Sequence, residues 1–285
     1  MYEKLNTTKT TPKAELNNEQ AIIALYELLK NAFPNKNIQR EPLNIQTIGN
    51  YGIINPGTKH IQNVLLKLDR KTRSKDDADK NASMAEVINH VVKTNYHKNE
   101  CKLYNEIRDW SRFTIVIPDY ASAPAVVASF LAKFGGKIDF HERDNYEAIH
   151  QHTTYKDVNV EFQFHTKEYA ELKRATDIFY HEYNNIVVPK NSRIESEKDA
   201  IEKQMTQYCQ IVYNRSDFKE SLPAVRQVAD DYLEKKPQTP KQRLRHFLEI
   251  VAKAEYVQKE LSEILPQFLA KINEADKIQL GTKNI

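Results

Sequence analysis

The sequence predicts an α+β protein, in which a mixed β-sheet is flanked by helices and followed by an all-helical C-terminal extension. Two observations carry this prediction. Strand-like and helix-like segments are mixed between residues 43 and 185, whereas the sequence beyond them is almost entirely charged and helix-favouring. We therefore expect an N-terminal tail and helix over residues 1–42, an α+β core over 43–185 and a helical extension over 186–285.

Composition limits the class of protein. The chain has 285 residues, of which 40% are hydrophobic and 28% charged, and these values are typical of a soluble globular protein. The net charge of +3 is too small to indicate a nucleic-acid-binding protein by itself. Cys101 and Cys209 lack metal-type spacing, and the polar segment Met1–Leu16 lacks the apolar core of a secretory signal. No apolar run reaches the roughly 18 residues of a membrane span, so we expect a cytoplasmic protein with free thiols and no membrane partner.

The first third of the chain is predicted to be mostly helical. Residues 1–17 are expected to be disordered or loosely attached, and apolar residues at helical spacing predict an amphipathic helix over Glu19–Phe33. A strand is expected over Leu43–Ile54, although its two glycines weaken the pattern. Helices are then expected over about Thr58–Arg73 and Ser83–Val92.

The remaining core segments alternate between strand and helix patterns. The expected strands are Arg112–Ile117, Ile138–Phe140, Glu147–Tyr155 and Val158–Phe164. The last two are predicted to form a hairpin that turns at Lys156-Asp157, and the expected helices are Ala123–Phe134 and Lys167–Tyr183. In the extension, we expect three helices divided by Pro223, Pro237 and Pro240.

A cationic helix face is the first candidate functional feature. At about 100° per residue, four polar side chains fall within roughly 80° of arc, while apolar residues occupy the other side. They are Lys59, Asn63, Lys67 and Arg70, and Lys71 extends the positive charge. Such a face at a helix N-terminus suits a polyphosphate, because lysines and free N–H groups both favour anions. The alternative is an ordinary solvated face of an amphipathic helix.

Two further features carry carboxylates next to strands. Asp109 comes just before the strand that Arg112 opens, where a carboxylate is well placed to hold Mg²⁺. In the last strand of the hairpin, alternation separates an apolar face from a polar one. The polar face carries Glu161, Gln163 and His165. Alone, each feature also fits an ordinary loop or a solvent-facing side of a strand.

Together, these features resemble the motifs of RelA/SpoT-like synthetases, over roughly residues 43–185. The family carries lysine, serine and lysine at four-residue intervals, then an aspartate before an arginine and a strand. It continues with Gly-Tyr-x-Ser-x-His, Glu-x-Gln-x-Arg-Thr and a helix with His and Tyr near its end. The corresponding segments here are Lys59/Asn63/Lys67, Asp109/Arg112, residues 145–150, residues 161–166 and residues 180–183.

This chain departs from the family pattern at several positions. Asn63 stands in place of the serine, His165 in place of the usual arginine and Asn145 in place of the glycine before the tyrosine. The arginine two residues before the first lysine is Gly57 here. These changes concern the phosphate and acceptor sites, whereas Asp109 and Glu161 match the family.

The resemblance implies a nucleotidyltransferase-like synthetase core and a pyrophosphokinase activity. Such an enzyme transfers the β,γ-pyrophosphate of ATP to the 3′-hydroxyl of a nucleotide acceptor, such as GDP, GTP or an adenine nucleotide, and so makes an alarmone. It further implies that Asp109 and Glu161 are catalytic and bind Mg²⁺, and that Glu161 deprotonates the hydroxyl. The implied phosphate-binding residues are Lys59, Asn63, Lys67, Arg70, Lys71 and Arg112, and the implied acceptor-binding residues are Tyr146, His150, Gln163 and His165.

Three alternatives stay open. Some small toxins of this family act on the 3′ end of tRNA, and the basic residues between Lys67 and Lys75 and in the helical extension could hold an RNA backbone. His150, His152, His165 and Glu161 could instead form a histidine-rich metal site. The chain could also be a non-catalytic nucleotide-binding relative. The C-terminal helices are expected to shield the site, bind a neutralising partner such as an antitoxin, or mediate self-association.

Overall fold

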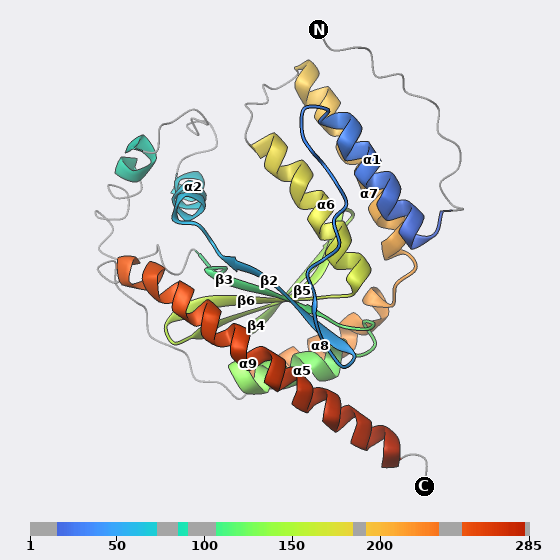
Figure 1. Cartoon of the computed structure of the whole chain (residues 1–285), viewed down its shortest axis with the longest axis vertical. Coiled ribbons are helices and arrows are strands. Elements are labelled where there is room, and N and C mark those ends of the chain that lie inside the picture. Colours follow the sequence, from blue (N-terminus) through green and yellow to red (C-terminus); the bar gives the residue numbers. More distant parts are fainter. Residues whose placement is uncertain (1–15, 73–84, 91–106, 185–191, 234–246, 283–285) are drawn as a thin grey trace.

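The computed structural model describes residues 16–72, 85–90, 107–184, 192–233 and 247–282, and it is an α+β fold built on one mixed sheet (Figure 1). The described strands are β1 (Gln46–Ile48), β2 (Tyr51–Thr58), β3 (Ser111–Val116), β4 (Lys137–Arg143), β5 (Tyr146–Tyr155) and β6 (Val158–His165). The described helices with assigned bounds are α1 (Asn18–Ala32), α2 (Ile61–Thr72), α5 (Ala123–Phe134), α6 (Lys167–Asn184), α7 (Arg193–Tyr213), α8 (Phe218–Leu233) and α9 (Phe247–Thr282).

The strand order is β1-β2-β3-β6-β5-β4. Neighbouring strands pair antiparallel throughout this described sheet, except that β3 and β6 run parallel at its centre. The parallel pair is connected through α5, β4 and β5, because adjacent parallel strands need a long crossover. Its register places Arg112 directly beside Glu161, so two distant motifs meet.

The predicted hairpin of β5 and β6 is confirmed. Lys156 and Asp157 form its two-residue turn with φ angles of 47° and 65°, the left-handed conformation that matches the twist of the flanking strands. Its register places His152 opposite Glu161 and His150 opposite Gln163. All four side chains therefore belong to one face of the sheet.

The expected single strand over Leu43–Ile54 is wrong. The chain reverses at Gly49, whose φ is 60°, and the segment becomes a hairpin of β1 and β2. A side chain at Gly49 would meet the side chain of Asn273 from α9, with the nearest atom at 2.4 Å. The turn is therefore fixed both by its positive φ angle and by close packing against the C-terminal helix.

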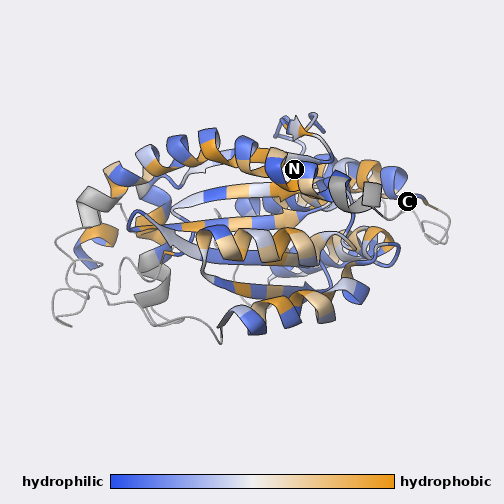
Figure 2. Ribbon diagram, turned by 90° about the horizontal axis from the view of Figure 1, so that it is seen from below, coloured by the Kyte–Doolittle hydropathy of each residue, from blue (hydrophilic) through white to orange (hydrophobic). Residues whose placement is uncertain are grey.

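The sheet is covered on both faces. Figure 1 shows α1, α6 and α7 on one side and α5, α8 and α9 on the other. Phe162 of β6 packs against Phe130 and Phe134 of α5, with ring centroids 5.2 and 5.1 Å apart, and Phe268 of α9 joins the same cluster. Figure 2 shows hydrophobic residues recurring along the helices with hydrophilic ones between them, as expected of helices that pack on one side.

The C-terminal helices are part of this same core. Along α9, a fully buried apolar residue recurs every four positions on the side that faces the sheet: Val257, Leu261, Leu265 and Leu269. The Ser111 hydroxyl at the start of β3 donates to the backbone carbonyl of Ala254 at 3.2 Å. Within the extension, α9 thus covers one face of the sheet, whereas α7 packs on α1 and α6 on the other side.

Most predicted helices are confirmed, with shifted ends for the second. The helix expected from Thr58 begins at Ile61, because Thr58 is still paired in β2. Of the helix expected over residues 83–92, the described part, 85–90, is helical. Of residues 1–17, which were expected to be disordered or loosely attached, 1–15 lie outside the described residues. Asn17 is ordered, because its side chain caps α1 by accepting from the backbone N–H of Gln20 at 2.9 Å.

Pro223 does not divide the extension as predicted. It lies inside α8, where Leu222 and Val225 are buried and the helix packs on α5. This packing outweighs the one backbone hydrogen bond that proline removes. The division falls instead at Asp217, whose carboxylate accepts from the backbone N–H groups of Tyr120 and Ala121 at 3.1 and 2.7 Å. Pro237 and Pro240 lie outside the described residues.

No described helix is both long and apolar enough to cross a lipid bilayer.

Candidate active site

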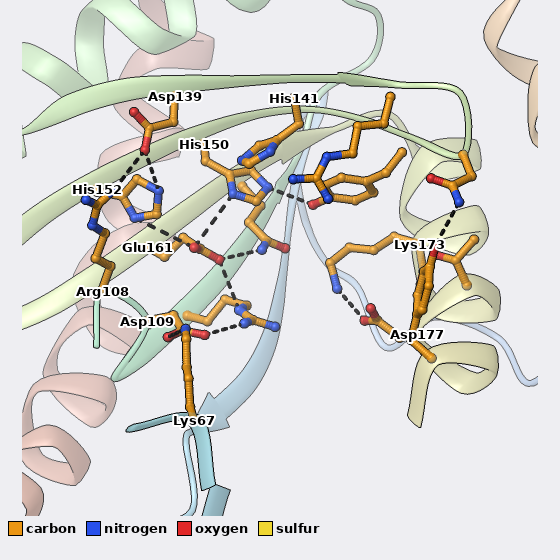
Figure 3. A pocket seen from close by; sticks show the side chains of 17 residues that line it. Lys67, Arg108, Asp109, Asp139, His141, His150, His152, Glu161, Lys173 and Asp177 are labelled. Carbon is orange, nitrogen blue, oxygen red and sulfur yellow. Dashed lines mark hydrogen bonds and ion pairs between the residues drawn. The ribbon is translucent and has the colours of Figure 1, made fainter. Parts of the chain in front are cut away.

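A cavity of about 650 Å³ opens over the face of the sheet that carries Glu161 (Figure 3). Its floor comes from the strand pairs β3–β6 and β5–β4, and one wall comes from α6. The site residues that the sequence predicted and that line this cavity are Lys67, Asp109, Arg112, Tyr146, His150, Glu161 and Gln163. Each of the five segments quoted above therefore contributes at least one side chain to a single cavity.

Asp109 is surrounded by cations. Its carboxylate accepts hydrogen bonds from Lys59 at 2.5 Å, from Lys67 at 2.8 Å and from Arg112 at 2.7 Å. Burial alone would raise the pKa of Asp109, but the charges of Lys59 and Lys67 outweigh it and hold that pKa well below its usual range. Asp109 is therefore ionised at neutral pH, and three positive charges share one negative charge.

Lys59 reaches this cluster from a different element than predicted. It precedes α2, and its backbone N–H donates to the carbonyl of Trp110 at 3.0 Å, which ties the end of β2 to the start of β3. The expected arrangement of Lys59, Asn63 and Lys67 on one helix face is therefore wrong for Lys59. The two lysines converge on Asp109 because the loop and the helix approach it from two directions.

Glu161 forms a second cluster at the centre of the sheet. Its Oε1 lies 3.1 Å from Nε of Arg112 and accepts from the Gln163 amide at 2.5 Å. Its Oε2 lies 3.6 Å from Nδ1 of His150 and 3.7 Å from Nδ1 of His152. The sequence analysis expected Glu161 to face away from the core, and it does, although it is only 7% exposed because the cavity walls surround it.

Arg112 links the two clusters. Its guanidinium contacts Asp109 through Nη2 and Glu161 through Nε. Burial lowers the pKa of an arginine, but the two carboxylates outweigh it and raise the pKa of Arg112 above its ordinary value. One rigid planar cation thus holds the carboxylates of two motifs at a fixed separation.

Tyr146 lies at the hairpin end of the cavity. Its hydroxyl is 2.7 Å from Nε2 of His150, and burial raises its pKa, so it stays protonated. Burial also lowers the pKa of His150 well below its ordinary value, with His165 and His141 adding to the effect. At neutral pH this end of the cavity is therefore lined by an uncharged phenol and an uncharged imidazole.

Apart from Lys59, four predicted site residues are not among the described residues that line the cavity. Asn63 is exposed and does not line it. The side chains of Arg70 and Lys71 lie outside the described residues. His165 is fully buried beneath the cavity, where neither ring nitrogen has a hydrogen-bond partner among the described residues, and burial lowers its pKa to about 3. It is an uncharged part of the packed interior rather than a phosphate ligand.

Sequence reasoning missed two groups of cavity residues. Asp139, His141 and Arg143 of β4 alternate along the strand, so they share the face that looks into the cavity. Lys173 and Asp177 of α6 recur at helical spacing with Tyr180 of the motif at residues 180–183, and Lys173 donates to Asp177 at 2.5 Å. Both periodicities are visible in the sequence, but only the fold shows which elements the two faces meet. Arg108, next to Asp109, was also missed and lines the cavity.

Comparisons with known proteins gave no match to a family model, to a curated protein or to a solved structure.

Proposed function

We propose that this chain is an ATP-dependent pyrophosphokinase similar to the RelA/SpoT-like synthetases, which transfers the β,γ-pyrophosphate of ATP to a nucleotide 3′-hydroxyl. One observation carries the proposal. Side chains from four separate motifs, represented by Lys67, Asp109, Tyr146 and Glu161, line a single cavity. Its volume of about 650 Å³ lies within the range of small-molecule sites, roughly 300–1,000 Å³.

The cations around Asp109 would bind the donor phosphates. Lys59, Lys67 and Arg112 carry three positive charges against the two carboxylates of Asp109 and Glu161, so one positive charge is left over. A triphosphate offers more negative charge and more acceptor oxygens than one carboxylate, so it is the stronger partner for this cluster. Phosphoryl transfer depends largely on such positioning and charge stabilisation, because little covalent chemistry falls to the protein.

Glu161 would take the proton of the attacking hydroxyl. In the transfer, the acceptor 3′-oxygen bonds to the β-phosphorus, the bond from that phosphorus to the oxygen bridging to the α-phosphate breaks, and AMP leaves. Glu161 is ringed by Arg112, Gln163, His150 and His152, which hold its carboxylate in one orientation. Tyr146, beside His150 at the end of the cavity, would lie against the acceptor base, and stacking tolerates different bases.

Mg²⁺ would enter with ATP. Both Asp109 oxygens accept from cations, and Arg112 lies between Asp109 and Glu161. The two carboxylates therefore fit Mg²⁺ only once the ATP phosphates have drawn the lysines away from Asp109, which would free an oxygen of the kind that Mg²⁺ prefers. The ion would then supply charge neutralisation on the phosphates.

The test is incubation of the full chain with γ-labelled ATP and Mg²⁺, with GDP, GTP, AMP, ADP and bulk tRNA supplied separately. The proposal expects label on at least one free nucleotide. Label on tRNA alone would show the toxin activity instead, and ATP binding without transfer to any acceptor would show a non-catalytic relative. The free-nucleotide acceptor is preferred, because a net charge of +3 is small for a protein that binds an RNA backbone.

A further inference from the structure

We propose that His150, His152 and Glu161 form a binding site for one divalent transition-metal cation, open to the cavity. The three residues occupy adjacent positions on β5 and β6, where His152 pairs with Glu161 across the hairpin and His150 follows on the same face (Figure 3). The inference rests on their geometry and not on the proposed transferase activity.

The ligand atoms already lie close to coordinating distance. One ligand atom from each residue can be chosen so that all three lie within 4.8 Å of one another, and Glu161 Oε2 is 3.6 and 3.7 Å from the two Nδ1 atoms. Around a tetrahedral zinc ion with bonds of about 2.0–2.2 Å, neighbouring ligand atoms are separated by roughly 3.3–3.6 Å. Small side-chain movements would thus place a cation between them.

The two carboxylate oxygens of Glu161 have different partners. Oε1 contacts Arg112 and Gln163, whereas Oε2 faces the imidazoles. The buried Nδ1 of His152 has no hydrogen-bond partner among the described residues. An unsatisfied buried nitrogen next to a carboxylate oxygen is costly unless something binds both, and a cation does so.

The far nitrogen of each imidazole is held in place. Nε2 of His150 lies 2.7 Å from the Tyr146 hydroxyl, and Nε2 of His152 lies 3.4 Å from Asp139. Asp139 is itself held by Lys137 at 2.9 Å. Metal-binding histidines usually have such a partner on their other nitrogen, which fixes the ring and leaves the first nitrogen to the metal.

The ligand types indicate the class of cation. Imidazole nitrogens suit zinc, copper, iron and nickel, whereas Mg²⁺ prefers oxygen ligands. Three protein ligands that all line the cavity leave at least one coordination position for water or a substrate oxygen.

The test measures metal binding without ATP. The tag-free full chain is stripped with a chelator and titrated with Co²⁺, whose visible absorption reports coordination, and with Zn²⁺ and Mg²⁺ by calorimetry. We expect one tight Co²⁺ or Zn²⁺ ion per chain that millimolar Mg²⁺ does not displace. His152→Gln should weaken binding by about 100-fold or more, and Asp139→Asn by about 10- to 100-fold.

His181→Gln is the control, because His181 lies on the exposed side of α6 and neither lines the cavity nor contributes an atom to the cluster. Its affinity should stay within about threefold of the unmodified chain, and circular dichroism establishes that each variant is folded. If His152→Gln does not fold, His150→Gln replaces it. No stoichiometric Co²⁺ or Zn²⁺ binding, unchanged affinity in the ligand variants, or equal binding of Mg²⁺ overturns the inference. Because ATP is absent and the transferase proposal does not need this ion, failure of the metal site would leave the transferase proposal untouched.

Discussion

Asp109 lies within hydrogen-bond distance of three cations, and this determines how the site behaves without a ligand. Its lowered pKa means that its contribution to stability is complete at neutral pH and is lost only as the pH falls through the aspartate range. The same carboxylate competes with any polyphosphate for Lys59, Lys67 and Arg112. Asp109 therefore stabilises the empty site and at the same time weakens the binding of the donor phosphates.

Asp109→Asn should lower stability and strengthen polyphosphate binding. Lys59 and Lys67 would lose their counter-charge, and Arg112 would keep only Glu161. We expect this to cost about 1–3 kcal/mol, less than for a fully buried pair because the cations are partly exposed. Added tripolyphosphate, without divalent cations, should then raise the melting temperature of the variant more than that of the unmodified chain. Asp139→Asn, which removes another cavity carboxylate, is the control. A smaller shift in Asp109→Asn would contradict the competition.

Glu161→Gln should fold normally and transfer almost no pyrophosphate. Glutamine keeps the size and hydrogen bonding of Glu161, and Arg112 keeps its contact with Asp109. Loss of a general base typically lowers the rate about 10²- to 10⁴-fold. Single-turnover rates and ATP affinity, measured on the same preparation, separate catalysis from binding. Near-normal turnover on the true acceptor would remove this hairpin from the chemistry.

At the scale of elements, the sequence predicted the helices and strands whose hydrophobic pattern is long and uninterrupted. α5 has the predicted bounds because an apolar helical pattern ends at two glycines, and the β5–β6 hairpin follows from alternation on both sides of one turn. The β1–β2 turn was missed although Gly49-Asn50 is a typical hairpin turn pair. The first strand, β1, has only three residues, which is too short to show an alternating pattern of its own. The α6 wall of the site was missed because local sequence does not show which surface a polar helix face will meet.

Gly136→Ala tests how closely β4 approaches the strand that carries His152. Gly136 has φ of 105°, and an added Cβ would lie 2.1 Å from the backbone oxygen of His152. Gly57→Ala is the matched control, since its φ is 86° but no atom lies within 4 Å of the added Cβ. We expect both to be destabilising, by about 1 kcal/mol or more from backbone strain, and Gly136→Ala to be worse by at least about 1 kcal/mol. Equal losses in urea unfolding would show that the close approach is not fixed.

For the whole molecule, the sequence predicted a helical extension separate from the α+β core. In the structure, buried residues of both parts belong to one hydrophobic core. The apolar residues of α9 recur every four positions, so its amphipathic character was readable. What that face covers was not readable, because it depends on the curvature and edges of a sheet assembled from distant segments. The convergence of Asp109 with Glu161 followed from a resemblance of motifs, and the parallel pairing of β3 with β6 gives it a physical basis.

Leu265→Ala tests whether the C-terminal helix and the sheet unfold together. Leu265 is fully buried, so its truncation should cost about 2–5 kcal/mol, whereas Tyr256→Ala on the exposed side of α9 should cost much less. Trp110 is the single tryptophan of the chain and is buried just before β3, so its fluorescence reports on the sheet. We expect its unfolding midpoint to fall in Leu265→Ala. An unchanged tryptophan transition would mean that α9 is an independent appendage.

The measurement that tests the central claim most directly follows the two ends of ATP separately. The full chain is incubated with Mg²⁺ and the preferred acceptor, once with ATP labelled in the α-phosphate and once with ATP labelled in the γ-phosphate. The account predicts that the γ label moves to the acceptor 3′-oxygen while an equal amount of α label leaves as AMP, and that Glu161→Gln abolishes both. Three results would contradict the account. They are formation of ADP, release of the γ label only as inorganic phosphate or pyrophosphate, and recovery of intact ATP with every acceptor.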